Sequence, residues 1–276
     1  MKIYSKCLII SVITLCIACN GNRQKASERF DNIQDAEKYF ANLFEVSLFQ
    51  FDEEFSSYLL SDTSSINYPF EMLVDSGIYF FNIISSKDGY LRFYSWCMMD
   101  CAFAPDYGHV YQYVSDGKVY SVKGTLMGNR DKVGGFYTTG ISNIHTLVID
   151  NQTVYLVHVW ERFMNNRNNL YCSDYMTRSI KAFKIIDGQL KEEKLFKTKF
   201  DTLSEISIEY CFDRNADYDG SIFLDEFSST LYIPIVRDFR ITDQYLLYQL
   251  KENIFEYIES KVERGKQVIL NQCFTF

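Results

Sequence analysis

From about residue 77 to residue 258 the chain alternates apolar and polar residues with a period of two, which is typical of β-strands with one buried face. The alternating runs occur in pairs, and several pairs are separated by turns such as Asp116-Gly117 or Asp187-Gly188. Asp-Gly between two such runs predicts a hairpin, because a type I′ turn needs positive φ at both central residues. The six predicted hairpins are Ile78–Ser85 with Tyr90–Trp96, Val110–Val114 with Lys118–Val122, His145–Ile149 with Thr153–Trp160, Ile180–Ile186 with Gln189–Phe196, Ser221–Leu224 with Thr230–Val236, and Gln244–Leu250 with Ile254–Ile258.

This series of hairpins predicts a mainly β protein built as an antiparallel hairpin meander. A propeller-like arrangement and a β-sandwich both fit the pattern, and we prefer the propeller-like one because nearly every predicted strand pair is sequential. Pro234 falls inside a predicted strand and cannot donate a ladder hydrogen bond. It therefore predicts an edge position or a β-bulge.

Near the N-terminus the apolar residues recur every three to four positions instead, which predicts one amphipathic helix over about residues 32–51. Asp31 and Gln34 have the spacing of a capping box at its start. We expect the apolar stripe of this helix to pack on the β body as core. Its members are Ile33, Ala36, Phe40, Leu43, Phe44, Leu48 and Phe51.

The first residues of the chain have the features of an export signal. Lys2 and Lys6 precede a short apolar run that is too short to cross a bilayer as a helix, and the small residue Ala18 precedes Cys19. This segment resembles the lipobox of bacterial lipoproteins, in which an aliphatic residue and small residues precede the cysteine that becomes acylated. Cys16 stands where that pattern usually has leucine.

The resemblance implies a lipoprotein signal peptide over residues 1–18 and acylation of Cys19 with diacylglycerol and an amide-linked chain such as palmitate. Two or more chains give stable membrane attachment. Asn20, where an aspartate would retain the protein at the inner membrane, favours the outer membrane; the resemblance does not indicate which face. We expect residues 19–30 to form a flexible tether and residues 31–276 to form a single β-rich domain.

The composition excludes one class of partner. The whole chain has a net charge of −8, and removal of residues 1–18 with their two lysines leaves −10. An acidic chain without Lys/Arg clusters is a poor nucleic-acid binder.

The cysteines leave their pairing open. Five cysteines remain beyond Cys19, an odd number that cannot all pair within one chain. Cys97 and Cys101 are the closest in sequence and are the most plausible disulfide, with buried thiols as the alternative.

One segment has the spacing of a calcium loop. Asn215, Asp217 and Asp219 occupy positions 1, 3 and 5, Gly220 occupies position 6 and Glu226 occupies position 12, which resembles the loop of EF-hands. The flanking residues alternate like strands, whereas an EF-hand has helices. Calcium is therefore one interpretation, and an acidic hairpin turn without any cofactor is the other.

No other cofactor or catalytic motif is present. The three histidines have neither His-x-His nor His-Glu-x-x-His spacing, and the chain has no Gly-x-Ser-x-Gly or Walker A sequence. Trp96 and Trp160 could stack on sugars, although aromatic residues at strand spacing more often form core. Long polar segments between hairpins are where a β scaffold usually carries recognition. They are Asp100–His109, Gly128–Gly140, Asn165–Arg178 and Asp213–Gly220.

These observations favour a non-catalytic binding or interaction module, anchored to the outer membrane by lipid, whose partner is a glycan or an outer-membrane protein. The alternative is an extracytoplasmic hydrolase that acts on glycans through paired Asp and Glu side chains, since such a pair is assembled by the fold and leaves no sequence motif.

Overall fold

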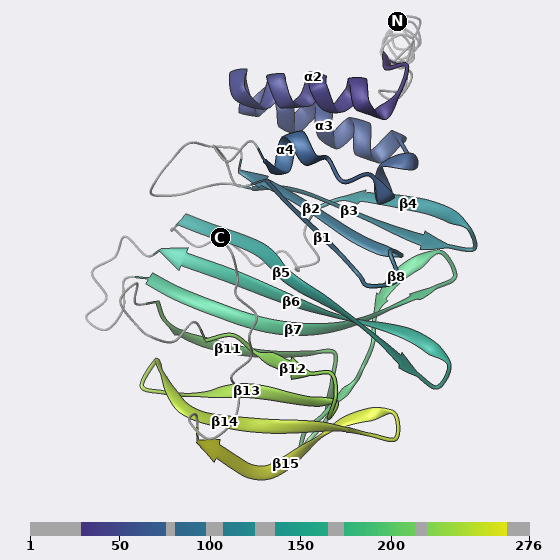
Figure 1. Ribbon diagram of the computed structural model, residues 1–276. Coiled ribbons are helices and arrows are strands. Elements are labelled where there is room, and N and C mark those ends of the chain that lie inside the picture. The colour runs from purple at the N-terminus through teal and green to yellow at the C-terminus, as the bar shows by residue number, and fades with distance from the viewer. Residues whose placement is uncertain are drawn as a thin grey trace, which may run out of the picture.

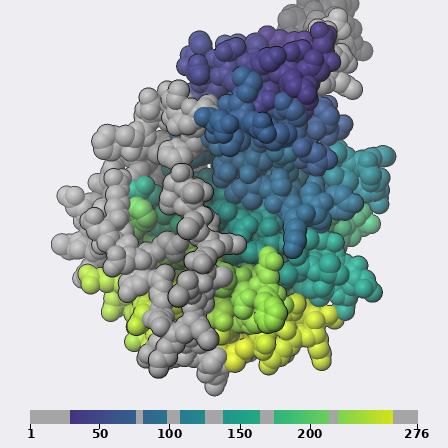
Figure 2. All heavy atoms as spheres, in the orientation of Figure 1, coloured from purple at the N-terminus to yellow at the C-terminus, as the bar shows by residue number. Residues whose placement is uncertain are grey.

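The computed structural model of this protein describes residues 29–75, 81–97, 107–124, 136–164, 174–212 and 220–263. A layer of helices and three β-sheets are stacked on one another, and the chain follows this order except that β9 and β10 join the third sheet before β11 returns to the second (Figure 1). The helical layer and the C-terminal hairpin lie at opposite ends of this stack, as the space-filling view also shows (Figure 2).

The helical layer contains two helices where the sequence predicted one. Its elements are α2 (Ile33–Val46), α3 (Leu48–Ser61), the 3-10 helix η2 (Ser64–Asn67) and α4 (Glu71–Val74). The predicted helix over 32–51 is wrong at Ser47, which has extended backbone angles and caps α3 by accepting a hydrogen bond from Gln50 N. The N-cap of α2 is Asn32 rather than Asp31, since the Asn32 side chain accepts from Asp35 N.

Each of the three sheets contains two of the six predicted hairpins. The first sheet has the order β1 (Phe81–Ser85), β2 (Leu91–Cys97), β3 (Tyr107–Ser115) and β4 (Lys118–Lys123). The second has the order β11-β7-β6-β5 with β8 paired to β7, and comprises β5 (Phe136–Ile149), β6 (Gln152–Met164), β7 (Asp174–Ile186), β8 (Gln189–Glu192) and β11 (Glu205–Cys211). The third has the order β10-β9-β15-β14-β13-β12, and comprises β9 (Phe196–Lys197), β10 (Thr202–Leu203), β12 (Phe223–Asp225), β13 (Thr230–Arg237), β14 (Arg240–Lys251) and β15 (Ile254–Glu263).

The mainly β, antiparallel hairpin architecture is confirmed, and the six predicted hairpins form. The arm predicted over Gln189–Phe196 is too long, because it pairs with β7 only as far as Glu192 and Phe196 belongs to β9 of the third sheet. Asp116-Gly117 and Asp187-Gly188 have positive φ at both residues, as the type I′ prediction requires. The ladder shifts register between Pro234 and Val236, which confirms the bulge. The sequence analysis missed the hairpin from β13 to β14, whose turn residues Asp238 and Phe239 also have positive φ.

Three apolar layers hold the stack together because alternate residues of a strand point to opposite faces. On β2, Tyr94 and Trp96 pack with the helices, whereas Leu91 and Phe93 pack with the second sheet. On β6, Tyr155 and Val157 face the first sheet, whereas Val154 and Leu156 face the third. Both faces of the first and second sheets are thus covered.

The predicted propeller-like arrangement is not identified in the part of the chain that the structure describes. The helical layer covers the outer face of the first sheet, so that face is not free to pack against the last sheet and close a ring. A two-sheet sandwich does not describe the fold either, since three sheets pack face to face (Figure 1).

Buried hydrogen bonds attach the helical layer to the first sheet. The Gln112 side chain of β3 donates to Leu59 O and to Ser65 Oγ, and Arg92 of β2 donates to the Ile66 carbonyl. Phe30 also packs on Tyr39, so the folded body begins before the predicted boundary at residue 31.

Candidate functional site

The two ends of the first and second sheets differ in how strands are connected, whereas the third sheet has a tight turn, at Asp238-Phe239, beside Tyr175 and Cys211. At one end, called the turn end here, tight turns at residues 86–90, 116–117, 150–151 and 187–188 connect β1 to β2, β3 to β4, β5 to β6 and β7 to β8. The opposite end is called the loop end (Figure 1). The other termini of β2, β3, β4, β5, β6 and β7 and the C-terminus of β11 lie there, as shown by the terminal pairs Cys97↔Tyr107, Phe136↔Met164 and Cys211↔Tyr175.

The four long polar segments of the sequence all join strand termini at the loop end. Their residues 100–106, 128–135, 165–173 and 213–219 fall outside the described residues, and the predicted segments run on into strands from Tyr107, Phe136 and Asp174. The described strand termini that flank these segments lie at one end of the stack although they are far apart in the sequence, and the sequence alone indicated each segment separately. A rigid scaffold with its long connections at one end is the usual arrangement for recognition.

Aromatic side chains from two sheets meet at the loop end. Tyr107 of β3 and Trp160 of β6 are partly buried, and their rings are 6.2 Å apart in an edge-to-face arrangement. The indole of Trp160 lies directly on Gly140 of β5, where an added Cβ would come within 2.7 Å of the ring. Glycine at this position therefore allows the indole to lie against the neighbouring strand.

An ion pair lies beside these rings. The Arg162 guanidinium donates from Nε to both carboxylate oxygens of Asp174, at 2.9 and 3.0 Å, and from Nη2 at 2.5 Å. The same guanidinium lies 4.6 Å from the ring centroid of Phe212, within cation–π range. The hydrogen bonds to Asp174 raise the pKa of Arg162. Asp174 is thus engaged as the anionic partner of an arginine.

His109 of β3 is buried between the first and second sheets near the loop end, beside the rings of Phe93 and Tyr107. Neither ring nitrogen has a hydrogen-bond partner among the described residues. Burial lowers the pKa of His109 to about 4, so its imidazole is neutral at pH 7.

The other two histidines lie together between the second and third sheets. His145 of β5 pairs with Leu156, and His158 of β6 pairs with Asn143, so the two histidines are diagonal neighbours on one face. They are not directly opposite, in agreement with their unequal offsets from the turn. Their ring centroids are 5.0 Å apart. This pair is the main feature that the search for sequence motifs missed.

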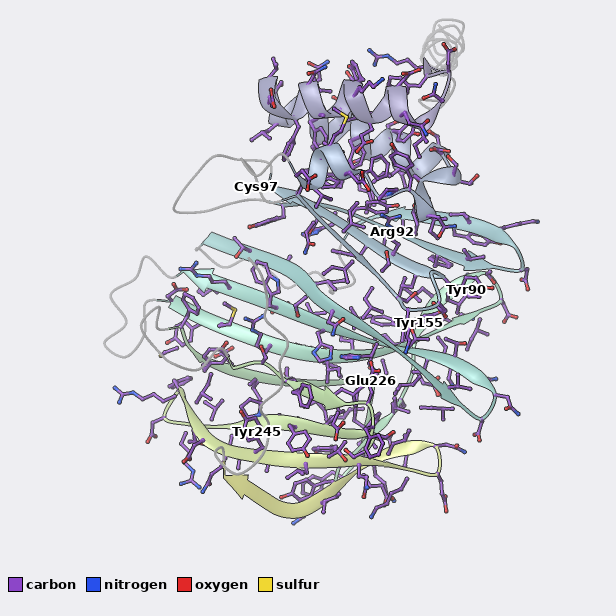
Figure 3. All side chains as sticks on the ribbon, in the orientation of Figure 1. Tyr90, Arg92, Cys97, Tyr155, Glu226 and Tyr245 are labelled. Atoms are coloured by element: carbon purple, nitrogen blue, oxygen red, sulfur yellow. The ribbon has the colours of Figure 1, made fainter. Side chains whose placement is uncertain are left out.

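Glu226 was predicted as a calcium ligand, and the structure gives it a histidine partner. It lies in the turn after β12, between the second and third sheets (Figure 3). Its Oε1 is 2.8 Å from Nδ1 of His145. Asn215, Asp217 and Asp219 lie outside the described residues, so the calcium site stays a prediction. No group of three or more His, Cys, Asp or Glu side chains suited to a metal ion occurs within the described ranges.

The remaining site residues have mixed outcomes. Cys97 is buried where β2 reaches the loop end, and Cys19 and Cys101 lie outside the described residues, so both the lipidation and the Cys97–Cys101 disulfide stay predictions (Figure 3). Cys211 is disulfide-bonded. Trp96 is fully buried core, and Trp160 alone is placed where it could meet a ligand.

Comparison with known proteins adds no functional assignment. The chain matches no family model and no curated protein sequence. Within the described ranges, none of the helices combines the length and apolar character that crossing a bilayer requires.

Proposed function

We propose that this protein is a non-catalytic binding module, anchored by lipid to the outer membrane, that captures its ligand at the loop end of the sheet stack. The observation that carries this proposal is the asymmetry of the first and second sheets: their tight turns lie at one end, and the strand termini at the other end flank the long polar segments of the sequence. The partly buried rings of Tyr107 and Trp160 at that end favour a glycan as the first ligand to test, with an outer-membrane protein as the second.

The location rests on two supports. The lipobox-like sequence ending at Cys19 supports export and acylation. The disulfide at Cys211 supports an oxidising compartment outside the cytoplasm, because cytosolic proteins rarely keep such bonds.

The anchor is tested by Cys19→Ala in the full-length chain. We expect the variant to leave the membrane fraction or to accumulate unprocessed, because the acyl chains attach only through the Cys19 thiol. Fractionation and mass spectrometry of the mature N-terminus measure this. A mature N-terminus at another residue, without lipid, would refute the proposed anchor and leave the binding function open.

Ligand capture is tested with a matched pair of tyrosine variants of the 20–276 fragment. Tyr107→Ala removes a ring at the loop end, and Tyr90→Ala removes an exposed ring at the turn end (Figure 3). We expect the first variant to weaken binding in a screen of glycans and outer-membrane proteins by about tenfold, the effect of about 1.4 kcal/mol, and the second to leave it unchanged. Equal loss in both variants, at unchanged melting temperature, would contradict recognition at the loop end.

The hydrolase alternative is tested in the same screen. Asp174 is a carboxylate at the loop end, and its pairing with Arg162 favours a structural role over acid–base chemistry. Product formation that disappears when one Asp or Glu is replaced, with the melting temperature preserved, would make the protein an enzyme.

A further inference from the structure

His145 and His158 carry an inference that is independent of the loop end. Their two rings approach within 5.0 Å between centroids, with a 59° angle between the ring planes. They come from two strands of one hairpin and face the third sheet, where Ile222 and Glu226 lie opposite them. His158 is buried, and the His145 side chain is 13% exposed.

Hydrogen bonds fix which nitrogen of each ring is available. Nδ1 of His145 lies 2.8 Å from the Glu226 carboxylate, to which it donates. His158 bonds to the Ile222 backbone, and since only Nε2 lacks a hydrogen-bond partner within the described ranges, Nδ1 is the nitrogen that donates there. Each ring therefore keeps its lone pair on Nε2. The Nε2 of His145 contacts the Asn143 amide at 3.1 Å, and that of His158 is buried without a partner.

The outer hydrogen bonds of the two rings are of the kind that metal-binding histidines make. A ligating imidazole donates its other N–H to a carboxylate or a backbone carbonyl, which sets the tautomer and the ring orientation. Here Glu226 and the Ile222 carbonyl supply one acceptor of each kind.

The separation of the rings also fits a shared ion. Zinc binds imidazole nitrogen at about 2.0–2.1 Å, and a ring centroid lies about 1.1 Å beyond that nitrogen. If two imidazoles bind one ion with a nitrogen–metal–nitrogen angle of about 105°, their ring centroids lie about 5 Å apart. The separation of 5.0 Å in this protein agrees with that value.

We propose that His145 and His158 bind a divalent transition-metal ion through their Nε2 atoms, with Glu226 and the Ile222 carbonyl as the outer hydrogen-bond acceptors. Zinc, copper and nickel suit imidazole ligands, whereas calcium and magnesium prefer oxygen. Two protein ligands leave the other positions on the ion to water or an anion. Binding displaces the Asn143 amide from His145.

Arg178 of β7 sets a limit on this site. Its charge acts on His158 and opposes a cation there, but its Nε–H is buried without a hydrogen-bond partner among the described groups. An anionic ligand on the metal, such as hydroxide or a carboxylate, would accept from that N–H and offset the repulsion. We therefore expect moderate affinity, lower than that of a site with three or four protein ligands.

The test is the melting temperature and calorimetric titration of the purified mature protein with Zn²⁺, with Ca²⁺ and Mg²⁺ at the same concentration as controls. At a free zinc concentration about ten times Kd we expect the melting temperature to rise by about 3–5 °C, and calcium and magnesium to leave it unchanged. His158→Gln should abolish the zinc effect. His109→Gln, which replaces a buried histidine of another layer, should retain it.

Glu226→Gln provides a variant that should fold, since the Glu226 side chain is 57% exposed. The substitution replaces the carboxylate that accepts the hydrogen bond from His145 Nδ1 with a neutral amide, a weaker acceptor. We expect zinc affinity to fall about 10–100-fold, with the melting temperature of the metal-free protein preserved. Absence of zinc binding in the wild-type protein would overturn the proposal. So would zinc stabilisation that persists undiminished in both His158→Gln and Glu226→Gln.

Discussion

Acidification from pH 7 to pH 4 is expected to remove several kcal/mol of folding stability, largely through His109 and His158. Burial lowers the pKa of His109 from 6.5 to about 4 and, with nearby charges, that of His158 to about 3. In the unfolded chain both imidazoles take up a proton near pH 6.5. The unfolded state therefore binds more protons below that pH, and stability falls as the pH falls from 6.5 toward the folded values.

The size of this effect is large compared with ordinary protein stability. Each unit of pKa difference corresponds to about 1.4 kcal/mol, so His109 contributes about 3 kcal/mol and His158 about 5 kcal/mol once both are protonated. Domains are commonly stable by about 5–15 kcal/mol. We therefore expect cooperative acid unfolding that begins well above pH 3.

His109→Leu isolates one part of this dependence. Since neither imidazole nitrogen of His109 has a hydrogen-bond partner among the described residues, an apolar side chain of similar volume should cost little at pH 7. Urea unfolding at pH 7 and pH 4 should show that the variant loses about 3 kcal/mol less than the wild type on acidification. Carboxylates titrate in both proteins and cancel in this comparison. The same loss in both proteins would show that His109 is not protonated on unfolding.

The sequence predicted what local chemistry determines. Asp-Gly turns fix hairpins over a few residues, and for that reason the hairpins around Gly117 and Gly188 could be located. The order of the sheets could not be predicted, because it depends on which faces pack together over long sequence separations. The break at Ser47 was missed because the apolar spacing of α2 continues into α3, and only the extended backbone of Ser47 separates them.

The histidine pair shows where sequence reasoning stopped short. A two-residue turn at Asp150-Asn151 pairs residue 149 with residue 152. The same register puts Asn143 opposite His158, and His145 is two positions from Asn143 on the same strand. An offset of two keeps both side chains on one face. The pair could thus have been found from the hairpin register, but the partners Glu226 and Ile222 come from the third sheet and depend on how the sheets stack.

Trp96→Ala is expected to cost about 3–5 kcal/mol of stability, the range for removal of a large buried aromatic side chain. Trp96 is fully buried, with ring centroids 5.3 Å from Phe55 and 5.8 Å from Phe51, both on α3. Its Nε1 donates to Asp52 at 3.0 Å, and its ring lies over Gly108 of β3. Loss of the indole would leave a cavity between the helices and the first sheet.

Trp96→Phe is the matched control, because it keeps a ring in the core and removes only the N–H bonded to Asp52. Asp52 retains its ion pair with Lys123 at 3.0 Å, so we expect this variant to cost about 1–2 kcal/mol. Urea unfolding followed by circular dichroism measures both variants, and the fluorescence of Trp160, the remaining tryptophan, then reports the second sheet separately. If the helical layer stabilises the whole stack, both signals should change together at a lower urea concentration in Trp96→Ala. If Trp160 instead unfolds at the wild-type midpoint, the helical layer and the sheets are independent units, and the tight packing around Trp96 serves the helices alone.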